Sequence, residues 1–199
     1  MRVKAILSTV VVMAAVVGPL AVLPSAVQAD PISTAPPATG AFTFTTGPGI
    51  LTTWAYNNIK VSGFSPAVYI TQNNGTQAIV AFPVVAHEKT AIFTGGSLRI
   101  TNSKTGDFIN CLNPAVDTLV RVVDCVMPDK TNKRLFAISN IASFRSLPTI
   151  YSVNSSFTGM DLKIASQEVA DYMNLKLHTN TFSPYVVFAT GELTVSYAR

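Results

Sequence analysis

The sequence contains few of the residues that carry chemistry. Its 199 residues include two cysteines, two histidines and one tryptophan, and only 12% are charged. No G-x-S-x-G elbow, H-E-x-x-H pair or P-loop occurs, which argues against the hydrolases, zinc peptidases and nucleotide-binding enzymes that use those motifs. The two histidines, His87 and His178, lack the spacing of a zinc site. We therefore expect no enzyme and no metal site; a secreted hydrolase with His87 or His178 as base is the weakest alternative.

Neither sign of charge is in large excess. The chain has 14 Lys and Arg against 10 Asp and Glu, a net charge of +4, and loss of Arg2 and Lys4 with a signal peptide would leave 12 against 10, a net of +2. No cluster of basic residues remains that could neutralise a row of phosphates. We expect no nucleic-acid partner, and the partner left open is a cell-envelope component or a small ligand.

The one long apolar run lies at the amino terminus. Arg2 and Lys4 precede AILSTVVVMAAVVGPLAVL, and Val27 and Ala29 occupy the small-residue positions of a signal-peptidase site. We predict a signal peptide over residues 1–29; an uncleaved anchor helix is the alternative. Export predicts a secreted, extracellular protein, with association at the cell envelope left open and no transmembrane span after cleavage.

The remaining chain divides into a short tether and one domain. Residues 30–40, DPISTAPPATG, predict a Pro/Ala/Thr-rich tether, and residues 41–199 a single β-rich domain. Short alternating segments are separated by turn residues such as the Asn-Asn-Gly at 73–75, and the last segment, ELTVSYAR, alternates most regularly. This pattern predicts a mainly β protein, an antiparallel β-sandwich that is Ig-like or related. The stretch ILTTWAYNNIK fits either a short helix or a strand.

One short helix is expected near the carboxyl end. In SQEVADYMNLKL, residues 166–177, the side chains of Val169, Met173 and Leu177 fall on one face at helical spacing, and Ser166 stands where an N-cap is needed. Such an apolar stripe is typical of a helix that packs on a sheet.

The two cysteines predict a disulfide. Cys111 and Cys125 reach an oxidising compartment if the signal peptide acts, which favours a disulfide bond over a reactive thiol. A three-residue hairpin loop at Asp117–Leu119 would place them directly opposite each other. Pro114 argues against this register, because proline has no backbone N–H to donate at a hydrogen-bonded position. Either a bulge occurs near Asn113–Pro114, or the turn itself lies there.

Several segments resemble a known group. The stretches FTGGSLRITNSKTGDFINCLNPAVDTLVRVV, KRLFAIS and MDLKIASQEVADYMNLKL, followed by FSPYVVFATGELTV, resemble secreted actinobacterial β-domain proteins and, more distantly, the HtaA-type domain of corynebacterial haem-uptake proteins. The resemblance implies a haem site made by a tyrosine near the domain start and a histidine just before a glycine. Gly96 stands where that histidine would be, Tyr56 matches the tyrosine loosely, and His87 lies upstream.

These observations give a first hypothesis and an alternative. The first is a non-enzymatic extracellular or cell-envelope interaction domain that needs no cofactor. The alternative is an HtaA-like protein that binds haem or another small ligand, with Tyr56 and His87 as ligand-binding residues.

Overall fold

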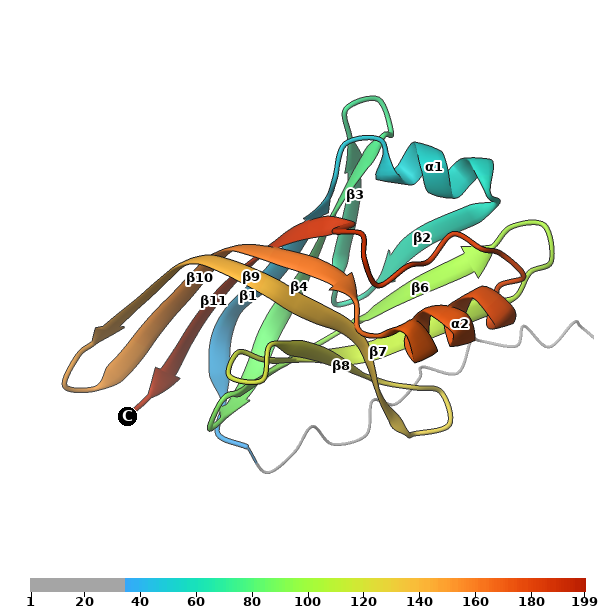
Figure 1. The fold of residues 1–199 in the computed structure, drawn as a ribbon. Coiled ribbons are helices and arrows are strands. Elements are labelled where there is room, and N and C mark those ends of the chain that lie inside the picture. The colour runs from blue at the N-terminus through green and yellow to red at the C-terminus, as the bar shows by residue number, and fades with distance from the viewer. Residues whose placement is uncertain (1–34) are drawn as a thin grey trace, which may run out of the picture. The chain divides into compact units, whose positions relative to one another are not determined.

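Eleven strands and two helices make up residues 35–199, the part of the chain that the computed structural model describes (Figure 1). The strands are β1 Ala38–Thr46, β2 Ile59–Phe64, β3 Val68–Gln72, β4 Gln77–Glu88, β5 Ala91–Thr94, β6 Ser97–Asn102, β7 Phe108–Asp117, β8 Val122–Val126, β9 Asn132–Pro148, β10 Ser152–Ile164 and β11 Ala189–Ala198. The helices are α1 Ile50–Tyr56 and α2 Gln167–Lys176. The predicted signal peptide lies outside the described residues.

Eight of the strands form a closed ring. Along the order β7, β5, β4, β1, β11, β10, β9 and β8, each strand pairs antiparallel with the next, and β8 pairs back to β7. Closure of this kind leaves the ring without a free edge along its paired segments. The mainly β expectation is confirmed, and the Ig-like sandwich is corrected to one continuous sheet. The sandwich prediction failed because the β7–β8 ladder joins the two ends of the strand order.

Three strands stand outside the ring and extend one end of it. On one edge of β7, residues 108–112 pair with β6, while residues 115–117 pair with β5. The edge of β4 is shared in the same way, by β3 at residues 77–81 and by β5 at residues 84–88. Strand β2 pairs with β6 and lies next to α1 on the right of Figure 1, and β3 lies above the ring.

The interior of the ring is filled with apolar side chains. Phe42 on β1, Phe82 on β4 and Leu193 on β11 are each at most 1% exposed, and the rings of Phe42 and Phe82 stack with centroids 6.1 Å apart. The void among these side chains has a volume of about 10 Å³, too small for anything beyond a single water. The ring is thus a packed core, and a ligand of any size must bind on its outside or at its ends.

The two helices pack on the sheet for different reasons. Helix α2 confirms the prediction for residues 166–177: the Ser166 hydroxyl accepts the N–H of Val169 at 3.2 Å, and Met173 is fully buried. The ambiguous stretch forms α1 and then β2. Trp54 decides this outcome, because its ring packs against Phe182 and Phe188 at centroid distances of 5.6 and 5.8 Å. Neither helix has the length and hydropathy of a membrane span.

Strand β1 begins at Ala38, three residues before the predicted start of the domain. Ala38 is 6% exposed and lies opposite Tyr197 of β11, so the end of the predicted tether is part of the sheet.

The predicted disulfide between Cys111 and Cys125 is confirmed, with a Cα–Cα distance of 4.8 Å. The directly opposite register is not found, because Leu112 pairs with Val126 and the ladder then shifts before Ala115. A bulge lies at residues 113–114, where Asn113 has a φ of 42°. The first of the two alternatives for Pro114 is therefore correct.

Candidate functional site

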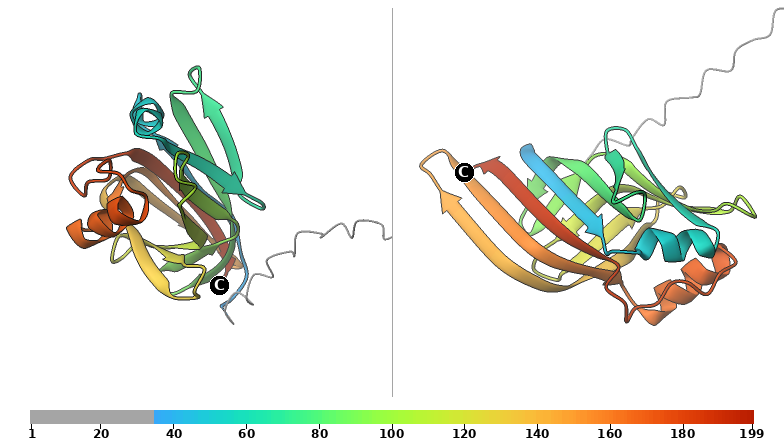
Figure 2. Two further views of the ribbon diagram at one scale, coloured as in Figure 1. Left: turned by 90° about the vertical axis from the view of Figure 1, so that its right-hand side faces the viewer. Right: turned by 90° about the horizontal axis from the view of Figure 1, so that it is seen from above.

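The β9–β10 hairpin extends beyond the closed ring. Strand β8 pairs with β9 only as far as Ala137, whereas β10 pairs with β9 to Pro148. We call residues 139–157 the arm. Figures 1 and 2 show the arm projecting next to the carboxyl end of β11, at the end of the ring away from α1.

The turn at the tip of the arm is well ordered by hydrogen bonds. The hydroxyl oxygen of Thr149 accepts the N–H groups of Tyr151 and Ser152 at 3.2 and 2.9 Å. Arg199 adds two contacts, from its N–H to the Tyr151 carbonyl at 3.1 Å and from its guanidinium to the Thr149 carbonyl at 3.4 Å. The arm is therefore a preformed surface, fixed at its tip by the last residue of the chain.

One face of the arm continues the inner face of the ring. Residues that pair directly across strands project to the same face of a sheet. Phe144 pairs with Phe157, and Phe157 pairs with the core residue Leu193. Two rows further toward the tip, Val153 pairs with Tyr197. We call the inward residues of the two arm strands the arm face: Phe144, Ser146, Pro148, Val153, Ser155 and Phe157.

Aromatic rings border this arm face on two sides, with small residues between them. The rings of Phe144 and Phe157 stack at 4.6 Å, and Phe144 is 58% exposed. Tyr197 lies four residues from Leu193 along β11, about 13 Å at the rise of a β-strand. Ser146 and Ser155 pair with each other in the row between. The arm face is thus a solvent-open shelf on which a row of serines lies between the Phe144–Phe157 stack and Tyr197.

His87 stacks on Tyr197 at the margin of the arm face. Their ring centroids are 3.9 Å apart and the planes are 14° from parallel. His87 pairs with Ile92, which is 2% exposed in the core, so the imidazole also points inward. The backbone N–H of His87 donates to the Pro36 carbonyl at 3.0 Å, which holds this end of β4 against the start of β1.

Partial burial keeps His87 neutral. Desolvation lowers the pKa of His87 below its ordinary value of 6.5, and a backbone hydrogen bond with Lys89 offsets part of that effect. A neutral imidazole has one unprotonated nitrogen and is therefore able to ligate a metal at neutral pH.

Protonation of His87 is expected to cost stability in acid. The folded pKa lies below the unfolded value, so the stabilising contribution is present above pH 6.5 and is lost as the pH falls through the folded pKa. We expect His87→Phe, which retains the ring stack, to lose less stability than wild type between neutral pH and pH 5. The difference should stay below about 1 kcal/mol because the ring is partly solvated. Urea denaturation at several pH values measures it, and parallel curves for the two proteins would contradict it.

Tyr56 and His87, the predicted ligand-binding pair, do not lie together. Tyr56 ends α1 and is 89% exposed, and α1 begins four residues after β1 ends. His87 contacts Pro36, just before β1 begins. The start of β1, beside His87, and its end, before α1, are about 30 Å apart, because nine residues of strand lie between them. Tyr197, which the sequence analysis did not select, is the tyrosine beside His87.

The position that the resemblance assigns to a histidine has no room for one. Gly96 has a φ of +101°, and a Cβ at this position would lie 2.5 Å from the backbone nitrogen of Ala67. The loop through Ala67 therefore fills the space that a side chain at residue 96 would need. A haem site built as the resemblance implies does not fit this chain.

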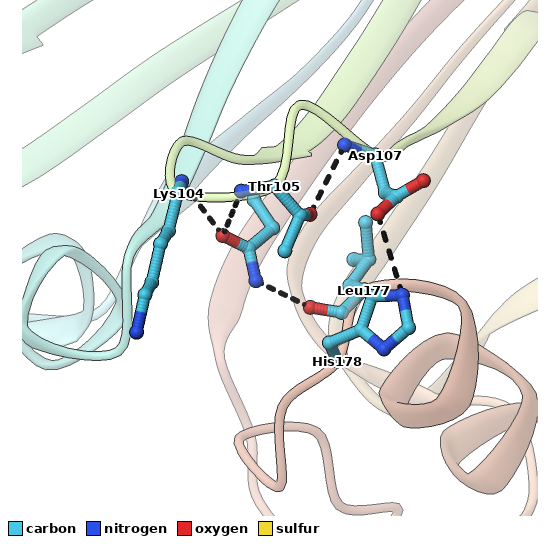
Figure 3. Close-up of polar contacts among 6 residues, drawn as sticks. Lys104, Thr105, Asp107, Leu177 and His178 are labelled. Atoms are coloured by element: carbon cyan, nitrogen blue, oxygen red, sulfur yellow. Dashed lines mark hydrogen bonds and ion pairs between the residues drawn. The ribbon is translucent and has the colours of Figure 1, made fainter.

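His178 belongs to a separate polar cluster beside α2 (Figure 3). Its Nε2 atom lies 3.3 Å from the Asp107 carboxylate, and Asn102 donates to the Leu177 carbonyl at 2.6 Å. These bonds fasten the β6–β7 turn to the end of α2. A solvent-open hollow of about 460 Å³ lies nearby, lined by Asp171, Asn174, Leu175, His178, Thr179 and Asn180. Among residues 35–199, the side-chain partner of His178 is the Asp107 carboxylate.

Comparison with known proteins gives distant structural matches. No protein-family model and no curated protein matches the sequence. The haem-binding protein HtaB of Corynebacterium glutamicum matches with 13% identity and a TM-score of 0.41, over 81% of this chain and 95% of that one. The carboxyl-terminal domain of HtaA from the same organism matches with 11% identity and a TM-score of 0.44, over 80% and 98%. The distant HtaA-type resemblance is confirmed, at a level that carries no argument about a ligand.

No group of three or more metal-ligating side chains gathers anywhere in the described chain. His87, Tyr197 and the arm face form the candidate site, because two ring stacks border one exposed surface there. Strand alternation did signal that Tyr197 faces the same side as Leu193 and Val195. The sequence could not show that β4 and β11 flank β1, which is what brings His87 and Tyr197 together.

Proposed function

We propose that this domain is a secreted, non-enzymatic binding protein that holds a flat hydrophobic ligand against the arm face, with haem as the first candidate. One observation carries the proposal: a half-buried, neutral imidazole stacked on Tyr197 beside an open shelf that ends in the Phe144–Phe157 pair. Flat ligands gain most from stacking against aromatic rings, and neutral imidazole is a common ligand of iron.

Haem is the first ligand to test because the sequence resemblance names it. When bound, haem would supply an iron atom that an imidazole nitrogen could ligate. The residues that would hold it are His87 at the margin and the apolar side chains of the arm face. The proposed site differs from the one that the resemblance implies, because the residue 96 position is closed and Tyr56 is remote.

Haemin titration of the secreted protein tests this proposal. We expect a Soret shift with wild type and at least an approximately ten-fold weaker affinity for His87→Ala, which corresponds to about 1.4 kcal/mol. Tyr197→Phe keeps the aromatic ring and removes the hydroxyl. It therefore distinguishes a contribution of the Tyr197 ring to stacking from ligation by its hydroxyl. Tyr56→Phe is the matched control and should leave binding unchanged because Tyr56 is exposed and distant.

Two results would overturn haem binding at the arm face. The first is a wild-type spectrum that haemin does not change. The second is an affinity that Tyr56→Phe reduces and His87→Ala does not, which would move the site to α1.

The second candidate function is the interaction domain that the sequence favoured first. Large apolar side chains are exposed at the tip of the arm: Leu147 at 67%, Ile150 at 78% and Tyr151 at 79%. Exposed apolar groups that gather at one place mark binding surfaces for other macromolecules. This candidate replaces ligand binding if haemin leaves the wild-type spectrum unchanged.

A further inference from the structure

Within residues 35–199, the outer edge of the arm is a long β-strand edge without a partner strand. Beyond Ala137, where pairing with β8 ends, β9 pairs only with β10 along the arm. Residues 140–148 form this free edge. An edge of this length presents a row of backbone N–H and C=O groups that can pair with another strand.

Residues 140–148 have few of the features that usually prevent such pairing, and the bulge in β9 lies just before them, at Ser139. Natural edge strands are short, bulged toward solvent, or carry lysine or proline along their length. Residues 140–148 contain one charged residue, Arg145, and their only proline is the last residue, Pro148. The turn at Thr149 and the contacts of Arg199 already hold the strand in place. Pairing would therefore cost little conformational entropy.

We propose that this free edge pairs antiparallel with the same edge of a second copy of the chain, around a two-fold axis at Phe144. Full overlap of residues 140–148 with themselves places that axis at the middle residue. Phe144 then lies opposite Phe144 of the second copy, and aromatic pairs directly across strands are favourable. Phe144 is available for this contact because it is 58% exposed.

The charge pattern of the edge suits pairing with itself. Around an axis at Phe144, Arg145 lies opposite Ser143 of the second copy, so the single charge of each edge meets a small polar residue. Like charges directly opposite each other would be destabilising, and this register avoids them. Both residues are exposed, and both point to the face opposite Phe144 because neighbouring residues of a strand alternate.

This self-pairing does not depend on the proposed ligand. Two copies joined at β9 would form one continuous sheet, with their arm faces side by side on the same surface. The dimer is tested without haemin, so its failure and the failure of ligand binding are separate results.

Opposite charges at position 143 test both the dimer and its register. Ser143→Glu places a carboxylate opposite Arg145 of the second copy, twice in each dimer, whereas Ser143→Lys places two cations together. We expect wild type to dimerise in sedimentation equilibrium at high micromolar concentration. Ser143→Glu should bind itself about five-fold more tightly and Ser143→Lys about five-fold more weakly, with both effects reduced by salt.

Amide exchange gives an independent readout. Protection of residues 140–148 should rise with protein concentration, while protection of the closed ring stays constant. A wild-type protein that remains monomeric throughout the concentration range overturns the proposal. A dimer whose affinity Ser143→Glu and Ser143→Lys change in the same direction overturns the register, and with it the proposed interface.

Discussion

Gly96→Ala is expected to lower the free energy of unfolding by about 3 kcal/mol or more. Two costs add at this position. A non-glycine residue is strained at a φ of +101°, and the new Cβ would lie 2.5 Å from the nitrogen and 2.7 Å from the Cβ of Ala67. Because the first of those atoms is backbone, the contact is relieved only by moving the loop. Urea denaturation of the two proteins measures the loss.

Gly106→Ala separates the two costs. Gly106 has a φ of +82°, also in the left-handed region, but a Cβ there would meet nothing within 4 Å. We expect Gly106→Ala to cost only about 1 kcal/mol, from backbone conformation alone. The excess in Gly96→Ala then measures the contact with Ala67. Equal losses in the two variants would mean that the Ala67 loop gives way freely, and a histidine at residue 96 would again be possible.

This result bears directly on the haem hypothesis. If the contact with Ala67 is as costly as expected, Gly96→His will destabilise the fold without restoring the histidine of the resemblance. A ligand site that forms in this chain must then use residues elsewhere, and His87 with Tyr197 is the pair that the fold brings together.

Local features of the fold could be predicted from the sequence because local physics decides them. The Asn73–Gly75 turn joins β3 and β4 as expected, since Asn73 and Asn74 adopt positive φ angles that asparagine tolerates. Ser166 caps α2 because a serine hydroxyl satisfies a free N–H at a helix start. The disulfide could be predicted from two cysteines and the expected export of the chain.

Features that depend on distant pairing could not be predicted. Closure of the ring requires β7 to pair with β8 while β8 also pairs with β9, and no periodicity encodes that choice. The stack of His87 on Tyr197 joins residues far apart in the sequence through the shared neighbour β1. The arm is recognised only once the end of β8 is known, because the loss of that neighbouring strand is what distinguishes the arm from the ring.

Removal of the disulfide is expected to cost about 3 kcal/mol, as for a closed loop of about 15 residues. Cys111 and Cys125 lie on β7 and β8, the two strands whose pairing closes the ring. That ladder is interrupted by the bulge at residues 113–114, so only Leu112 pairs with β8 on the near side of the bulge. The covalent bond therefore holds the closing strands together where backbone pairing is weakest.

Cys111→Ala combined with Cys125→Ala measures this contribution in chemical denaturation. Both sulfur atoms are buried, so the alanine pair adds a small cavity cost and leaves no unsatisfied polar group. Dithiothreitol supplies the matched control: it should lower the melting temperature of wild type and leave the double variant unchanged. Because the closure of the ring depends on the pairing of β8 with β7, the amides of β8 should lose exchange protection first. A loss below about 1 kcal/mol, or uniform loss of protection, would show that the β7–β8 ladder closes the ring without the bond.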